Sequence, residues 1–227
     1  MDLSRVSLSS ASQALSRLRE DLGALPPLTL STLPPGETAL FLVDLIEGFA
    51  RTGPLSSPRV ESLLAPAAAL LRRCASLGFA CVAFADTHTP DSLELQSYPS
   101  HCLAGTEEAR ICRELADAGG YTLIPKDSTN GFVEPAFESW RESHPHIRRY
   151  LVVGDCTDIC IAQFALTAKA WHNARRLPLQ VMVPLSLVDT YDGGTHQADL
   201  MNLTALASLQ GNGIELYSHI VDTKAEV

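Results

Sequence analysis

Residues 150–160, YLVVGDCTDIC, join a short apolar run to a cysteine at the start of a segment with helical periodicity. We predict residues 150–154 to be a buried strand, because the run is short, apolar and rich in valine and ends at a glycine. We predict residues 157–174 to be a long helix with Cys160 in its first turn. A strand that turns directly into a helix is part of a βαβ unit, so this stretch decides the class of fold.

The same alternation extends along the chain in both directions. We predict further strands over residues 38–44, 79–85, 121–125, 180–184 and 214–217, and further helices over residues 58–77, 106–118, 135–143 and 196–209. Apolar strands that alternate with helices are typical of a parallel sheet covered on both faces. The sequence therefore predicts a Rossmann-like α/β fold with three αβα layers and a mostly parallel sheet.

The composition narrows the class of protein. The 227 residues include 17 basic and 26 acidic side chains, which gives a net charge of −9, and 46% of the residues are hydrophobic. That apolar fraction is enough for a folded core, and the acidic balance argues against a nucleic-acid partner. The apolar runs are too short to span a membrane, and residues 1–20 lack the apolar core of a signal peptide. Six cysteines are too few for a disulfide scaffold, so we predict reduced thiols in a cytoplasmic protein.

Two parts of the chain differ in their patterns. In residues 1–37, Leu15, Leu18 and Leu22 recur at helical spacing, and prolines cluster between residues 26 and 35. We predict a short amphipathic helix that packs on the body of the protein, followed by an extended arm. Residues 38–227 contain the predicted strands and form the main domain.

Polar side chains follow the predicted strands at the points where they end. Asp44, Asp86 and Lys126 each come at the end of a strand, and Cys160 follows the fourth. Because ligands bind beyond the carboxyl ends of parallel strands, these residues are candidates for one site. For each residue taken alone, the alternative is that it has no function and is polar only because the end of a strand meets solvent.

Cys160 is the candidate nucleophile. The dipole and free N–H groups at a helix start stabilise a thiolate, which predicts a lowered pKa for this thiol. Asp44 could accept the thiol proton, Lys126 could favour the charged form, and the same N–H groups could form an oxyanion hole. The alternative is that Cys160 is a small apolar residue packed in the core.

A second group of residues has the pattern of a metal site. Asp86 and His88 are two residues apart, and Glu94 and His101 follow in the same loop. Mixed carboxylate and imidazole ligands suit Zn²⁺, Fe²⁺ or Mn²⁺. The alternative is that these are ordinary solvated loop histidines.

Taken together, these motifs resemble a known family. They are Asp44…Phe49, Asp86-x-His88, His101-Cys102-x-x-Gly105-Thr106, Lys126…Phe132 and Gly154-x-x-Thr157-Asp158-x-Cys160. The set is similar to the isochorismatase-like cysteine hydrolases and, because of its metal loop, most resembles their nicotinamidase (pyrazinamidase) branch. The resemblance spans residues 38–217.

The resemblance implies a reaction and roles for residues. It implies hydrolysis of nicotinamide to nicotinate and ammonia through a cysteine thioester, within NAD salvage. Asp44, Lys126 and Cys160 would be catalytic, and the backbone N–H groups of Cys156 and Cys160 would form the oxyanion hole after a cis Asp155–Cys156 peptide. A divalent metal, zinc before iron or manganese, would bind the pyridine nitrogen. The implied metal ligands are Asp86, His88, Glu94 and His101, the implied ring contacts are Phe49 and Tyr98, and the implied assembly is a homo-oligomer.

Some positions depart from the family pattern. The usual glutamine two residues after the first aspartate is Ile46, the usual D-W-H is Asp86-Thr87-His88, and Glu94 stands where many members have a third histidine. These departures leave another small amide, or an enol ether, open as the substrate. A noncatalytic protein, or a redox protein that uses Cys156 and Cys160, is the further alternative.

Overall fold

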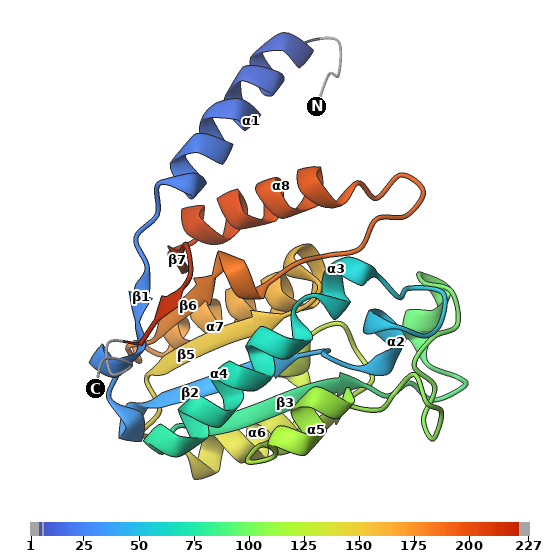
Figure 1. Ribbon diagram of the computed structural model, residues 1–227, viewed down its shortest axis with the longest axis vertical. Helices are drawn as coiled ribbons and strands as arrows, with labels where there is room; N and C mark the ends of the chain where they lie inside the picture. Colours follow the sequence, from blue (N-terminus) through green and yellow to red (C-terminus); the bar gives the residue numbers. More distant parts are fainter. Residues whose placement is uncertain (1–4, 6, 223–227) are drawn as a thin grey trace.

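The computed structural model describes residue 5 and residues 7–222, and a six-stranded parallel sheet forms its centre (Figure 1). The strands lie in the order β4-β3-β2-β5-β6-β7, and each neighbouring pair is parallel. Their bounds are β2 Thr38–Val43, β3 Ala80–Asp86, β4 Thr122–Lys126, β5 Arg149–Gly154, β6 Gln180–Pro184 and β7 Glu215–Tyr217. The predicted α/β fold and parallel sheet are confirmed.

Helices cover both faces of the sheet, as the three-layer prediction requires (Figure 1). Alternate residues of β2 enter different cores: Leu40 and Leu42 belong to the core that includes α4 and α5, whereas Phe41 belongs to the core that includes α6, α7 and α8. A strand buried on both faces therefore reads as a continuous apolar run. The helices are α1 Leu8–Gly23, α2 Glu47–Ala50, α3 Pro58–Glu61, α4 Leu64–Leu77, α5 Arg113–Ala118, α6 Pro135–Ser143, α7 Ala162–Ala174 and α8 Ala198–Gly211.

Three predicted helices differ from the structure. The helix predicted over residues 58–77 is split into α3 and α4, because Pro66 in an unbroken helix would clash with the carbonyl of Ser62. The helix predicted over residues 106–118 is shortened to α5. Ile111 forms an antiparallel bridge with Ile46 instead, and the next residue donates its N–H to the Leu45 carbonyl. The helix predicted from residue 157 begins with a π-helical turn, Thr157–Ile161, ahead of α7.

The N-terminal helix packs on the body over only a small part of its length. In α1, Leu22 is buried and Leu18 contacts the core partly, whereas Leu8 is 81% exposed and the helix extends beyond α8 (Figure 1). The predicted packing of this helix on the body is therefore confirmed only near its C-terminal end, at Leu18 and Leu22. The arm that follows is held more firmly than predicted, because β1 Leu28–Thr29 pairs with β8 Ile220–Val221. Over the residues described, no helix combines the length and apolar character needed to cross a bilayer.

Aromatic rings fill the core between the sheet and the α6–α8 layer. The ring centroid of Phe41 lies 4.6 Å from that of Tyr150, 5.0 Å from that of Phe164 and 5.7 Å from that of Phe137. Phe41 and Phe137 are fully buried. Because β2 is a central strand, this cluster holds the strand that ends at the candidate site.

We expect Phe41→Ala to lower the free energy of unfolding by about 3–5 kcal/mol, because a fully buried ring leaves a cavity behind. Urea denaturation followed by circular dichroism measures the change. The matched control is Leu123→Ala on β4, where the side chain is 48% exposed and the expected change is below about 1 kcal/mol. Equal losses in the two variants would contradict this description of the core.

Candidate active site

The carboxyl ends of adjacent strands bring the predicted site residues together. Asp44 follows β2, Asp86 ends β3 and Lys126 ends β4, where the register pairs Lys126 directly with Asp86. Asp44 adopts a positive φ of 52°, and its N–H donates to the Phe84 carbonyl at 3.1 Å. The parallel sheet thus gathers at one edge residues that lie up to 82 positions apart in the chain.

Lys126 is the centre of this group. Its Nζ lies 2.8 Å from Asp44 Oδ2, forms an ion pair with Asp86 Oδ1, and donates to the Ser128 carbonyl at 3.2 Å. Cys160 Sγ lies 3.8 Å from the same nitrogen. Burial disfavours the charged lysine, but the two carboxylates outweigh it and hold the pKa of Lys126 well above its usual value.

The pKa values of the two carboxyl groups are shifted in opposite directions. Burial raises the pKa of Asp44 to about 6, with a further contribution from Asp86 and an opposing one from Lys126. Burial also acts to raise the pKa of Asp86, but the attraction of Lys126 outweighs it and holds that pKa well below its usual range. Asp44 can therefore exchange a proton near neutral pH while Asp86 stays ionised, which is the separation that acid–base catalysis needs.

Cys160 lies in the π-helical turn and faces this group. Its Sγ and a carboxylate oxygen from each of Asp44 and Asp86 all lie within 4.8 Å of one another. The predicted lowering of its pKa at a helix start is wrong: burial raises the pKa of the thiol well above its usual value, and Lys126 only partly opposes this. A buried neutral thiol requires a base to ionise it, and Asp44 is within reach.

The backbone before Cys160 has the expected turn. The Asp155–Cys156 peptide bond is cis, as the resemblance implies, and the Thr157 N–H donates to the Asp189 carbonyl at 3.0 Å. Asp155 is fully buried, and burial raises the pKa of its carboxyl group well above the usual value. From the sequence, Asp155 was predicted only as part of the cis peptide bond, and Asp189 was not predicted at all.

Three of the four predicted metal ligands form a compact set. Asp86 Oδ2 lies 3.5 Å from His88 Nε2 and 3.7 Å from His101 Nε2. His88 Nδ1 contacts Asp127 Oδ1 at 2.9 Å and His101 Nδ1 contacts the Pro99 carbonyl at 2.8 Å, which directs both Nε2 atoms inward. His88 Nε2 is buried without a hydrogen-bond partner. An inward carboxylate oxygen and two inward imidazole nitrogens fit a divalent metal.

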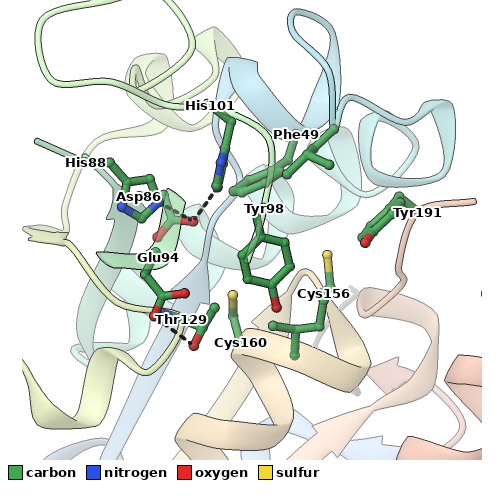
Figure 2. A pocket seen from close by; sticks show the side chains of 12 residues that line it. Phe49, Asp86, His88, Glu94, Tyr98, His101, Thr129, Cys156, Cys160 and Tyr191 are labelled. Atoms are coloured by element: carbon green, nitrogen blue, oxygen red, sulfur yellow. Dashed lines mark hydrogen bonds and ion pairs between the residues drawn. The ribbon is translucent and has the colours of Figure 1, made fainter. Parts of the chain in front are cut away.

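Glu94 lies outside this compact set. Its Oε1 accepts a hydrogen bond from the Thr129 N–H at 3.1 Å. Among the described residues, the histidine-containing set whose ligand atoms all lie within 4.8 Å of one another consists of Asp86, His88 and His101, without Glu94. Glu94 nevertheless lines the same cavity (Figure 2). Its role as a metal ligand stays a prediction.

One cavity is lined by residues of both groups, with Cys160 from the first and Asp86, His88 and His101 from the second. Figure 2 shows aromatic rings above the two cysteines, where the centroid of the His101 ring lies 5.6 Å from that of Phe49 and 6.1 Å from that of Tyr98. Both aromatic residues line the cavity, as the resemblance implies. Four further lining residues belong to no motif and were not predicted from the sequence: Leu55, Thr129, Ile159 and Tyr191.

We expect Lys126→Met to lower the free energy of unfolding by about 3–5 kcal/mol, because it leaves two buried carboxyl groups without their cation. Urea denaturation at neutral pH measures the change. In the control Lys169→Met, the lost group donates to the Leu179 carbonyl and has no carboxylate partner among the described residues, so we expect about 1 kcal/mol or less. A Lys126 variant as stable as the control would contradict the ion-pair account.

Known proteins resemble this chain in sequence and in fold. Residues 38–210 match the family model of the isochorismatase domain. The chain is 30% identical over 210 residues to Nicotinamidase 1 of Arabidopsis thaliana, which covers 80% of this chain and 85% of that protein. It also resembles the solved pyrazinamidase/nicotinamidase of Streptococcus mutans UA159, with a TM-score of 0.68 and 19% identity over 79% of this chain and 99% of that one. The pyrazinamidase of Pyrococcus horikoshii in complex with zinc has a TM-score of 0.65 and 21% identity, over 82% of this chain and 99% of that one.

Proposed function

The chain belongs to the isochorismatase family as an amidohydrolase, and from that premise we propose that it is a nicotinamidase, hydrolysing nicotinamide to nicotinate and ammonia. The observation that carries the proposal is the contact of Cys160 with a buried lysine and a carboxyl group of raised pKa at the bottom of one cavity. The 30% identity to a nicotinamidase supports the choice of substrate.

The proposed reaction has two halves. In the first, Asp44 takes the proton of Cys160, the thiolate attacks the carboxamide carbon, and the backbone N–H groups of Cys156 and Cys160 stabilise the oxyanion. The C–N bond then breaks, Asp44 returns the proton to the nitrogen, ammonia leaves, and a thioester remains. In the second half, Asp44 takes a proton from water, which attacks the thioester, and the C–S bond breaks. Nicotinate leaves and the thiol regains its proton.

Lys126 stabilises the negative charge of the site in both halves of the reaction. The ammonium lies 2.8 Å from Asp44 Oδ2 and 3.8 Å from Cys160 Sγ, so it stabilises whichever of the two groups carries the negative charge. The proton can then pass between thiol and carboxyl without leaving an unpaired charge in a buried site.

Asp86, His88 and His101 are the residues that would hold a divalent metal. Bound there, it would offer the pyridine nitrogen a coordination position and so orient the ring. We propose zinc, with iron or manganese as alternatives, and Glu94 as a further ligand. The free Nε2 of His88 supports the metal itself rather than its identity.

The side chains of the cavity offer no free cationic partner to an anionic substrate. Asp86 and Glu94 line the cavity, no lysine or arginine does among the described residues, and the Lys126 ammonium already faces two carboxylates. A substrate that carries carboxylates, as the enol ether of an isochorismatase does, would find no lysine or arginine to pair with, whereas a neutral amide needs none.

The proposal also covers the cellular location of the protein, its assembly and its metabolic role. The six cysteines form no disulfide and are buried, which supports reduced thiols in a cytoplasmic protein. The family resemblance supports a homo-oligomer and a place in the salvage of NAD.

We expect the wild-type protein to release ammonia from nicotinamide and Cys160→Ala to lose at least about a thousandfold in kcat, because it removes the sulfur that lies against Lys126 and Asp44. A coupled assay for ammonia measures the rate. We expect at least a loss of about a hundredfold for Asp44→Asn, which cannot accept the thiol proton. The matched control is Cys81→Ala, which removes a buried thiol outside the cavity. Turnover by Cys160→Ala at the control rate would exclude the thioester mechanism.

We expect about one divalent ion per chain by elemental mass spectrometry, and its loss together with activity on treatment with a chelator. His101→Ala should lower the metal content at least about tenfold, because it removes one inward nitrogen. The control His146→Ala changes an exposed histidine and should leave the metal content unchanged. Full turnover by protein shown to be free of metal would overturn the metal assignment.

A further inference from the structure

Tyr191 is one of the four cavity residues that no motif indicated. It is half-buried and lies in the loop between the 3-10 turn Leu185–Leu187 and helix α8. Figure 2 places it at the opposite end of the cavity from the metal-ligand set Asp86, His88 and His101, with Cys156 and Cys160 between the two. Its position therefore limits how far a molecule can extend from that set past the nucleophile.

Three contacts tether Tyr191 to the nucleophile turn through His196. The rings of Tyr191 and His196 stack with centroids 4.1 Å apart and planes at 7°. His196 Nδ1 donates to the Tyr191 carbonyl at 2.8 Å, and Nε2 lies 2.8 Å from Asp158 Oδ2, two residues before Cys160. The orientation of the Tyr191 ring is thus coupled to the turn that carries the reacting sulfur.

The start of the same loop is anchored independently by Asp189. Its Oδ1 accepts hydrogen bonds from Arg59 Nε at 2.9 Å and Asn202 Nδ2 at 2.8 Å, while its carbonyl accepts from the Thr157 N–H. Because both ends of the segment 189–196 are bound to the body, Tyr191 forms a wall at a defined position.

We propose that Tyr191 is a specificity-determining residue that closes the carboxamide end of the cavity and restricts the enzyme to primary amides, with His196 as its positioning residue. This inference rests on the proposed function for the orientation of the substrate. With the ring nitrogen toward Asp86, His88 and His101 and the carbonyl carbon at Cys160, an alkyl group on the amide nitrogen extends away from the ring. It would therefore meet the side of the cavity that Tyr191 closes.

The kinetic test compares nicotinamide with N-methylnicotinamide. We expect Tyr191→Ala to reduce the preference in kcat/KM for the primary amide at least about tenfold, and Tyr191→Phe to retain it because the ring remains. His196→Ala should shift the preference in the same direction. The double variant should shift it no further than Tyr191→Ala alone, because His196 acts through Tyr191. His146→Ala is the control for the loss of a histidine in His196→Ala. Tyr217→Phe is the control for the loss of a tyrosine hydroxyl in Tyr191→Phe.

A second measurement does not depend on the substrate. The rate of alkylation of Cys160 is measured with iodoacetamide, which is small, and with N-ethylmaleimide, which is bulkier. Tandem mass spectrometry distinguishes alkylation of Cys160 from alkylation of Cys156. We expect Tyr191→Ala to raise the rate with the bulkier reagent at least about fivefold relative to the smaller one, a change of about 1 kcal/mol in barrier.

The outcomes separate the two proposals. If the wild-type protein ignores nicotinamide but Tyr191→Ala still changes the alkylation ratio, the nicotinamidase assignment fails and the wall formed by Tyr191 stands. If the wild-type protein hydrolyses nicotinamide while folded Tyr191→Ala leaves both the amide preference and the alkylation ratio unchanged, the inference is overturned. Additive effects of Tyr191→Ala and His196→Ala would overturn the positioning role of His196.

Discussion

The ammonium group of Lys126, buried between two carboxyl groups, is the interaction on which this site depends. Isolated charges are costly in a protein interior, and this cluster is tolerated because each charge faces its counterion within a few ångströms. The three residues end or follow three neighbouring strands, so the sheet must be correctly registered for the charges to pair. Folding and the proposed chemistry therefore rely on the same contacts.

Asp86 links the two halves of the site. One carboxylate oxygen pairs with Lys126, and the other faces His88 and His101. The low pKa of Asp86 keeps it ionised for both roles and also helps to raise the pKa of Asp44. A single carboxylate thus lies between the proposed proton acceptor, Asp44, and the two histidines of the proposed metal site.

Several features were predictable from the sequence because they depend on local pattern. Continuous apolar runs are typical of strands buried on both faces, and a polar residue at the end of such a run lies at the carboxyl edge of a parallel sheet. Asp44, Asp86, Lys126 and Cys160 were found in this way. Helix boundaries that depend on distant partners could not be predicted in this way. For example, Ile111 pairs with Ile46 across the fold instead of continuing a helix.

The sequence by itself determined the class of fold, the family resemblance and the reactive residue types, because these follow from periodicity and from short motifs. Only the tertiary structure decided the proton affinities, since burial raises the pKa of Cys160 where a helix start alone would lower it. It also decided which loop closes the cavity. Tyr191 lies 31 residues after Cys160 in the chain, and only folding brings its ring to the cavity that the sulfur lines. Such contacts depend on the packing of whole elements, and local sequence carries no record of them.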